Sequence, residues 1–245
     1  MSPRRKPDTT PDAPLVWERP EPPVRPSPGP LSREAIIGAA IALADREGLG
    51  AVSFRKVGAA LDAGPMRLYG YVSTKEELLE LMVDAVYGEM PLSEVKGEWR
   101  QALRALAHGM RRMSMKHPWF PELLGSRPHI GPNALAHLEA TLAAFSETLG
   151  FENIDDVMLA VTTVKAYVMG AIQSEVTELR IERETGMDKE RWQSANGAYI
   201  LRMIATGRYP TLGKVVEKAT HPSPDVRFDM GLDYVLDGIA ARHLR

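Results

Sequence analysis

Residues 53–75 constrain the fold more than any other part of the sequence, because they show the pattern of a short helix, a tight turn and a second short helix. The first helix is expected at about residues 54–61, with Val57, Ala60 and Leu61 at the spacing of a buried face. The sequence Asp-Ala-Gly that follows ends this helix. The layout is typical of a helix-turn-helix that reads DNA.

The second short helix is expected to begin at Pro65, whose fixed φ is already helical and whose missing N–H would have no partner in a first turn. Leu68 is expected to face inward three residues later. The side chains left free to face a DNA groove are Met66, Arg67, Tyr69 and Tyr71. One turn of helix would therefore carry most of the base contacts.

Two further helices are expected to support this short pair. Upstream, Ser32 is the predicted N-cap of an amphipathic helix. Downstream, Ser73 is the predicted N-cap of another, with Glu76 completing a capping box. Lys75 lies in the first turn of that helix, where free N–H groups and a cation together would hold a phosphate. Residues 31–90 are thus predicted to form one DNA-binding domain.

The order of these signals resembles the DNA-binding domain of the tetracycline repressor (TetR) family. The match rests on G-L-x-x-V-S-x-R-K-V-G followed by G-P-M-R-L-Y-G-Y-V-S-T-K-E-E-L-L. The resemblance implies that phosphates are held by Ser53, Arg55, Tyr69 and Lys75. It implies that bases are approached by Met66, Arg67 and Tyr71. The predicted DNA-binding set is completed by Lys56, Gly64 and Pro65.

Charge supports an alternative for this segment, an ordinary helical hairpin with a solvated basic face. Residues 31–90 contain six Lys or Arg and nine Asp or Glu, whereas nucleic-acid-binding domains usually carry net positive charge. Within residues 53–75, however, four basic residues accompany a single acid, Asp62. The predicted DNA contact area is small but positive, so salt-sensitive binding is expected.

Residues 1–30 differ in composition from the rest, since ten of them are Pro. Pro at this density excludes helix and central strand, so an extended or disordered arm is expected. The basic triplet Arg-Arg-Lys at residues 4–6 would suit the minor groove beside the recognition helix. The alternative is a leader with no role, although Val16 and Trp17 are unusual in a disordered segment and suggest docking on the folded body.

Residues 91–245 show helical spacing and no strand alternation, so the fold class is predicted to be all-α. Long helices are expected at about residues 99–117, 134–149 and 154–184. The TetR resemblance implies that this part is a larger ligand-binding and dimerisation domain.

Two of the expected helices carry apolar seams that suit a dimer interface. The helix near 154–184 has a coiled-coil seam of Ile154, Val157, Val161, Val164, Val168 and Ala171. The last helix, near 224–242, has Phe228, Leu232, Val235 and Ile239. Two such helices from each of two chains would form a four-helix interface, as the resemblance also implies. Packing inside one chain is the alternative for both seams.

The run L-G-S-R-P-H-I-G-P-N-A-L-A-H-L-E-A resembles the ligand-pocket segment of the family's prototype. The prototype has a metal-binding His directly before this run, where the present sequence has Leu123. A metal-free, largely apolar effector is therefore expected. Candidate pocket residues are Met110, Met113, Trp119, Phe120, Ser126, Phe145, Tyr167 and Gln173. For about half of them, plain core packing is the alternative.

Several classes of site and protein are disfavoured. The chain has no Cys, and its six His show no metal-binding spacing, so neither a metal nor a cofactor is expected. The motifs G-x-S-x-G, G-x-x-x-x-G-K-[ST] and G-x-G-x-x-G are absent, which argues against an enzyme. The longest apolar run, residues 35–44, is too short to cross a bilayer, and no signal peptide opens the chain. A cytoplasmic protein without membrane association is expected.

These patterns together predict a ligand-responsive, DNA-binding transcriptional regulator. They favour a homodimeric repressor that a small apolar molecule releases from double-stranded operator DNA. One alternative is a helical small-molecule-binding or interaction protein with a degenerate DNA-binding domain. Another is a TetR-type activator without an inducer.

Overall fold

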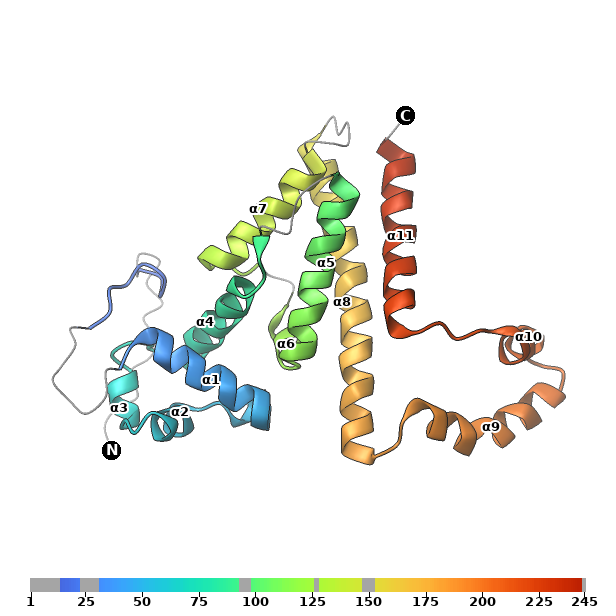
Figure 1. Ribbon diagram of the computed structural model, residues 1–245, viewed down its shortest axis with the longest axis horizontal. Helices are drawn as coiled ribbons and strands as arrows, with labels where there is room; N and C mark the ends of the chain where they lie inside the picture. Colours follow the sequence, from blue (N-terminus) through green and yellow to red (C-terminus); the bar gives the residue numbers. More distant parts are fainter. Residues whose placement is uncertain (1–13, 23–30, 93–97, 126–127, 147–152, 244–245) are drawn as a thin grey trace. The chain divides into compact units, whose positions relative to one another are not determined.

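The computed structural model describes residues 14–22, 31–92, 98–125, 128–146 and 153–243. Every regular element in these ranges is a helix, which confirms the predicted all-α fold class (Figure 1). The chain divides into two compact units, Met1–Val161 and Thr162–His243, and the division falls inside one long helix. Each unit is described separately below.

The first unit opens with three helices, α1 (Arg33–Glu47), α2 (Phe54–Ala60) and α3 (Pro65–Leu68), with a short 3-10 turn at Leu49–Ala51. Ser32 caps α1 as predicted, because its Oγ accepts a hydrogen bond from the Ala35 N–H at 3.1 Å. The start of α3 at Pro65 is likewise as predicted.

The turn between α2 and α3 differs from the prediction in one residue. Ala60 is exposed, and the buried apolar residue is Ala63 instead. The Ala63 N–H donates to the carbonyl of Gly58 at 2.9 Å, and Asp62 adopts a left-handed φ of 49°. Because the chain reverses over Gly58, Ala63 covers the inner face of α2 that the helical spacing had assigned to Ala60.

The next helix, α4 (Lys75–Gly88), is capped one residue later than expected. Its N-cap is Thr74, whose Oγ1 accepts from the Glu77 N–H at 3.1 Å, while Glu77 Oε2 accepts from the Ser73 N–H at 2.8 Å. The predicted box of Ser73 and Glu76 is therefore wrong by one position. Ser-Thr followed by Glu-Glu fits either register, and only the folded backbone distinguishes them.

The rest of the first unit contains α5 (Trp99–Lys116), α6 (Phe120–Leu123), α7 (Pro132–Ser146) and the first turns of α8 (Ile154–Thr185). Helix α4 lies between α1 and α7 and packs against α6 as well (Figure 1). It is consequently buried on more than one face. The apolar core of α1–α4 continues into Trp119 and Phe120, so the boundary of this compact unit does not coincide with the predicted domain boundary after residue 90.

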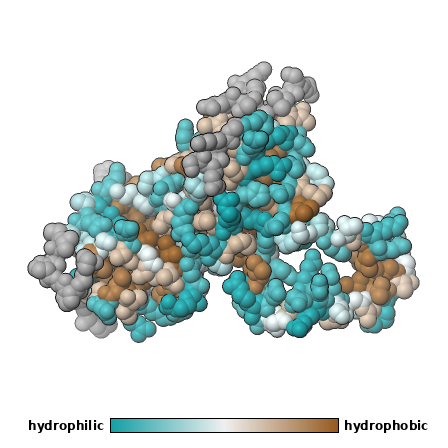
Figure 2. Space-filling model, in the orientation of Figure 1, coloured by the Kyte–Doolittle hydropathy of each residue, from teal (hydrophilic) through white to brown (hydrophobic). Residues whose placement is uncertain are grey.

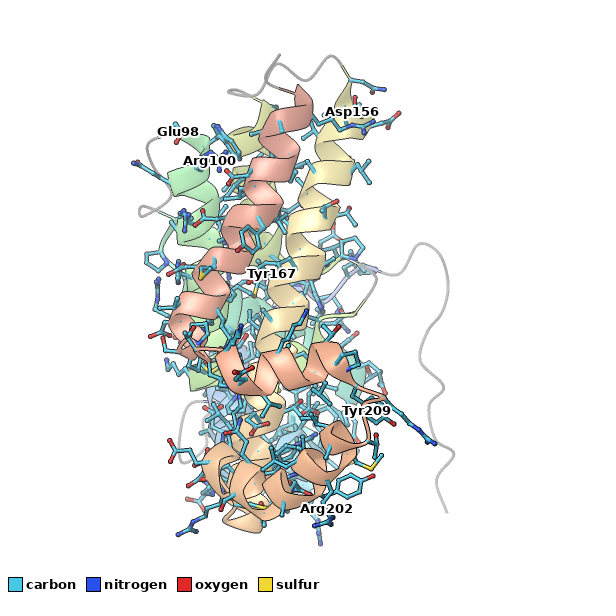
Figure 3. The ribbon with its side chains drawn as sticks, turned by 90° about the vertical axis from the view of Figure 1, so that its right-hand side faces the viewer. Glu98, Arg100, Asp156, Tyr167, Arg202 and Tyr209 are labelled. Atoms are coloured by element: carbon cyan, nitrogen blue, oxygen red, sulfur yellow. The ribbon has the colours of Figure 1, made fainter. Side chains whose placement is uncertain are left out.

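The second unit contains the remainder of α8 with α9 (Lys189–Ala205), α10 (Pro210–Lys218) and α11 (Pro224–His243). Helices α8 and α11 lie side by side, and Tyr167 of α8 is directed at the backbone of α11 (Figure 3). The Tyr167 hydroxyl donates to the carbonyl of Phe228 at 2.7 Å. This approach requires glycine at 231, because a Cβ there would lie 2.3 Å from the Tyr167 oxygen.

Most of the two predicted dimer seams is buried within a single chain. The buried members are Val157, Val161, Val164, Val168, Phe228 and Leu232. Ile154, the first predicted seam residue, is instead 65% exposed. The periodicity thus identified the inner faces of α8 and α11 and not an open seam.

Helix α8 has 32 residues and a mean hydropathy of 1.3 over its most apolar window, so by length and composition it could cross a membrane. The longest uninterrupted apolar run in the sequence did not reveal this property. Core helices of soluble proteins share it, and regularly spaced valines of α8 are buried within the chain.

Helices α9 and α10 carry an exposed hydrophobic patch, seen at the right of Figure 2, which includes Leu201, Leu212, Val215 and Val216.

The close turn after α2 predicts that Gly58→Ala destabilises the protein. A Cβ at Gly58 would lie 2.5 Å from the Ala63 carbonyl oxygen, so backbone must shift. We expect the free energy of unfolding to fall by about 1–3 kcal/mol in urea denaturation at fixed protein concentration. Gly38→Ala is the matched control, since nothing lies within 4 Å of a Cβ there, and it should stabilise α1 by about 0.5–1 kcal/mol. Equal stability of the two variants would contradict the proposed turn geometry.

Candidate DNA-binding site

The short helix α3 presents a continuous exposed surface. Met66 is 79% exposed and Tyr69 46% exposed, while Leu68 between them is fully buried. Arg67 is exposed on the same turn. Gly64 and Pro65, which begin the helix, are exposed as well. A single buried anchor therefore holds a helix whose other side chains all face outward.

Tyr69 is held in place by an aromatic contact. Its ring stacks on that of Phe54 at a centroid distance of 4.5 Å and an interplanar angle of 27°. Phe54 is the first residue of α2, so the stack joins the two short helices. Tyr71 differs from Tyr69, because it is only partly exposed and packs against the apolar core. It is less accessible than the sequence suggested.

The predicted basic contacts fall into two groups. Arg55 and Lys75 are exposed, and Lys75 is the first residue of α4. Lys56 is exposed as well, but it forms an ion pair within the chain, with its Nζ 2.7 Å from Glu47 Oε2. Hydrogen bonds from Lys56 and Arg46 hold the pKa of Glu47 below its ordinary value.

Ser53 has a structural task in addition to any contact with DNA. Its Oγ accepts the Lys56 N–H at 3.3 Å and caps α2. An N-cap serine keeps its hydroxyl hydrogen for a further acceptor, so the cap leaves a phosphate contact open.

Behind this surface, a buried carboxylate fastens α4 to α7. Asp84, in the middle of α4, is 4% exposed, and its Oδ1 accepts the Ala134 N–H in the first turn of α7 at 2.8 Å. Its Oδ2 accepts from Asn133 Nδ2 at 3.0 Å. Gly131 permits the approach, because a Cβ there would lie 2.3 Å from Asp84 Oδ1. The negative charge therefore lies at the positive end of a helix.

One turn further along α4, Tyr87 makes a second link to the same helices. Its carbonyl lies 3.0 Å from His137 Nε2 of α7, and its ring packs edge-on against Phe120 of α6 at 5.5 Å. Burial raises the pKa of Tyr87 to about 12, with a contribution from the charge of Asp84. Burial lowers the pKa of His137. Both side chains are accordingly neutral at pH 7.

A third link joins α1 and the end of α4 to the corner between α5 and α6. Asp45 Oδ1 accepts from Trp119 Nε1 at 2.6 Å and lies 2.7 Å from His117 Nδ1. Glu89 Oε2 pairs with Lys116 Nζ at 2.5 Å and lies 3.4 Å from His117 Nε2. Burial acts to raise the pKa of Glu89, but hydrogen bonds from Lys116 and His117 outweigh it and keep the pKa below its ordinary value.

The structure places the predicted pocket residues in separate locations. Trp119 and Phe120 belong to the core shared with α1–α4, and Met110 and Met113 pack against it. Phe145 is buried beside Trp99, with ring centroids 6.2 Å apart. In the second unit, Tyr167 contacts α11 and Gln173 is exposed. Ser126 lies outside the described residues.

The polar residues of these links other than Trp119 were not identified as functional from the sequence, and they are Asp45, Asp84, Tyr87, Glu89, Lys116, His117, Asn133 and His137. Asp84 carried a usable signal, because it lies between inward-facing positions of an amphipathic helix, where a charged residue needs a partner. Asp45 and His117 are 72 residues apart and gave no such signal.

Comparison with known proteins identifies the family. A family model described as tetracyclin repressor-like, C-terminal domain, matches residues 90–243. The HTH-type transcriptional repressor DrrR1 of Streptomyces coeruleorubidus is 36% identical over 231 residues, which span 92% of this chain and 83% of that protein. The chain belongs to the tetracycline repressor (TetR) family. An HTH-type transcriptional regulator of Saccharopolyspora erythraea is 34% identical over 243 residues, 98% of each chain.

The solved structures agree with this assignment. The Streptomyces coelicolor TetR family protein ActR, in complex with actinorhodin, superposes with a TM-score of 0.73 at 25% identity, covering 87% of this chain and 98% of that one. As a TetR family member, the present protein is a DNA-binding transcriptional regulator and not an enzyme. The prediction of its function class is confirmed.

Proposed function

We propose that this TetR protein is a repressor that binds operator DNA through α2, α3 and the start of α4, and that a small molecule releases it. The exposed surface of α3 carries the proposal, because Met66, Arg67 and Tyr69 all face outward from one turn of helix that Leu68 alone anchors in the core. The DNA-binding domain is residues 31–90, and residues 91–245 form the effector-binding and dimerisation domain. The repressor acts in the cytoplasm.

The DNA contacts divide by chemistry. Arg67 and Met66 project from the first turn of α3 and approach base edges in the major groove, together with the accessible part of Tyr71. Arg55, Tyr69 and the hydroxyl of Ser53 bind phosphates. Lys75 adds a cation to the free N–H groups at the start of α4. Lys56 contributes less, because its ammonium is already paired with Glu47.

The effector is a metal-free, largely apolar compound that binds within residues 91–245. The ActR complex with actinorhodin supports the effector class, since that relative binds an organic molecule. Among the described residues, no group of three or more His, Asp or Glu is placed to hold a metal ion. Of the candidate residues, we assign Phe145 to effector contact, whereas Trp119 and Phe120 act as core at the junction with α1 and α4.

Helix α4 transmits the effector signal to the DNA-binding surface. It is fastened to α7 through Asp84 and Tyr87, and to the end of α5 through Glu89. Lys75 at its other end lies in the DNA-binding surface. A displacement of α5–α7 therefore moves α4 and with it one phosphate contact. To change occupancy from nearly full to nearly empty, the effector must prefer the released state by roughly 10⁴-fold.

The protein acts as a homodimer through α8 and α11, using the faces opposite to their buried ones. On α11 these positions are Met230, Tyr234 and Gly238, and Tyr234 is 71% exposed. On α8 the exposed positions include Ala166 and Gly170. Small residues on one helix facing large ones on the other suit close helix packing. Two recognition helices would then reach successive major grooves.

Arg67→Ala and Lys75→Ala should separate base contacts from phosphate contacts. We expect Arg67→Ala to weaken operator binding by about 1–3 kcal/mol and to relax preference at one base pair. Lys75→Ala should weaken binding to all sequences alike and reduce the salt slope by about 1. The measurement is mobility shift on DNA flanking the protein's own gene and on a random duplex. Equal losses of Arg67→Ala on both duplexes would rule out base contact by Arg67.

Tyr234→Asp should dissociate the dimer without unfolding the chain. The Tyr234 side chain is exposed in the isolated chain, so an Asp there should not lower the free energy of unfolding. In the dimer interface the same charge would be buried without a partner, which would disfavour dimerisation. Sedimentation should show monomer, and operator affinity should collapse. Val164→Asp should instead unfold the protein, because Val164 is already buried. An unaltered dimer of Tyr234→Asp would place the interface elsewhere.

Removal of divalent metal should leave effector-induced release unchanged. Actinorhodin is the first probe, because ActR binds it. We expect the concentration that releases half of the DNA to be the same with and without EDTA, since apolar contacts dominate binding. Loss of release in EDTA would reveal a metal site. If actinorhodin does not release the DNA, the same comparison applies to the first releasing compound from a screen of aromatic molecules.

A further inference from the structure

Residues 14–22, which precede α1, pack against the first unit, and we call this segment the strap. Val16 is 3% exposed and belongs to the apolar core, and Trp17 packs against that core. A turn follows, with the Glu18 N–H donating to the Leu15 carbonyl at 3.0 Å. The strap is therefore part of the folded first unit.

Arg19, in the middle of the strap, closes a triangle of polar contacts with the start of α4. Its Nη1 donates to Ser73 Oγ at 2.6 Å, and its Nη2 lies 2.5 Å from Glu77 Oε2. Glu77 Oε2 also accepts from the Ser73 N–H at 2.8 Å. Ser73 is an exposed residue, yet both its backbone nitrogen and its hydroxyl oxygen are held in place.

The position of Arg19 is itself determined by contacts with α1. Arg33, the first residue of α1, donates from Nη2 to the Arg19 carbonyl at 3.0 Å. The Arg33 N–H donates to Glu21 Oε1 at 3.3 Å. The side chains of Arg19 and Glu77 are only 27% and 26% exposed, so water screens their attraction less than that of a fully exposed ion pair. The strap is thus bound to α1 through its backbone and to α4 through the Arg19 side chain.

The triangle lies beside residues that the proposed function assigns to DNA. Ser73 is two residues before Lys75, the proposed phosphate contact at the start of α4. The end of the strap reaches the chain just after α3, since a Cβ built on Gly70 would lie 3.5 Å from Pro22 Cγ. Ser73 is therefore an exposed hydroxyl at the edge of the proposed DNA-binding surface.

The contacts of Ser73 leave its hydroxyl able to donate. A serine hydroxyl has one hydrogen to donate and two lone pairs to accept with. Arg19 donates to the oxygen, so the hydroxyl hydrogen is available for an acceptor outside the triangle. A cation bound to the oxygen polarises the O–H bond and strengthens the hydrogen bond that it makes. An oriented hydroxyl of this kind suits a phosphate oxygen of the DNA backbone.

We propose that Ser73 is a further phosphate-binding residue of the operator complex and that Arg19 is its positioning residue. The Ser73 hydroxyl donates to the DNA backbone next to Lys75, and Arg19 fixes the hydroxyl oxygen from the strap. The proposal rests on the proposed operator binding by α2–α4, to which it adds a residue from the segment before α1.

The test measures the effect of Ser73→Ala by mobility shift on the duplex that flanks the protein's own gene and on a random duplex. We expect both affinities to fall by roughly tenfold per subunit, because a hydrogen bond to a charged group is lost and phosphates carry no base sequence. The slope of log affinity against log salt should stay at the wild-type value, since a neutral donor replaces no counterion. Ser73→Thr, which restores a hydroxyl, should recover most of the affinity.

A double-mutant cycle tests the positioning role of Arg19. Arg19→Gln would leave the Glu77 carboxylate without its partner, so every member of the cycle carries Glu77→Gln, whose amide oxygen still accepts from the Ser73 N–H. In this background, Arg19→Gln should weaken binding by about as much as Ser73→Ala. The two changes together should cost no more than either alone, because Arg19 acts through the Ser73 hydroxyl. Arg191→Gln, which removes an exposed cation from α9, is the charge-matched control and should bind as wild type.

Unchanged binding by Ser73→Ala would overturn the phosphate contact, and a loss confined to the specific duplex would overturn it as well. Multiplied losses in the cycle would show that Arg19 acts on binding through the stability of the strap, which would overturn its positioning role. Each of these results leaves operator binding by α2–α4 intact. Absence of specific binding by the wild-type protein would instead contradict the proposed function, so the two failures are distinguishable.

Discussion

The buried carboxylate of Asp84 is the interaction on which the arrangement of the first unit depends. It holds the start of α7 against the middle of α4, and the fit tolerates only glycine at 131. A lone buried carboxylate would be costly, but here backbone N–H and Asn133 satisfy it. Removing the carboxyl group would leave the N–H of Ala134 unpaired in the interior. Helix α4 consequently belongs equally to the proposed DNA-binding surface and to the helices behind it.

The proposed DNA-binding surface depends on this support because α3 is too short to be stable alone. A helix of four residues has scarcely one hydrogen-bonded turn, so its conformation comes from packing. Leu68 anchors it in the core, Phe54 stacks on Tyr69, and the turn closes over Gly58. The exposed side chains are therefore presented on a rigid base, as base recognition requires. Val16 and Trp17, from the segment before α1, pack into the same apolar core.

The elements that were predictable from the sequence are those with local causes. The cap of α1, the start of α3 at Pro65 and the long α8 follow from short-range signals, and they are present. The N-cap of α4 is Thr74, one residue later than predicted, because Ser73 and Thr74 are both followed three residues later by Glu and fit the capping-box pattern equally well. The apolar seams of α8 and α11 correctly predicted buried faces. Periodicity does not reveal, however, whether the same chain or a second chain covers these faces. Trp119 and Phe120 illustrate the same point, since aromatic content suggested a pocket and tertiary packing made them part of the core.

By itself, the sequence determined that this protein is all-helical and that residues 53–75 form a helix-turn-helix, because these properties arise from spacing, caps and turn residues that are near one another in the chain. Its class as a TetR regulator followed from the resemblance of these motifs to the family. Only the tertiary structure decided that Asp84 caps α7, that Asp45 meets His117 and Trp119, and that Arg19 contacts Ser73 and Glu77. Each of these contacts joins residues about 50 or more positions apart, where the pairing depends on which helix faces pack together and not on local conformational preference.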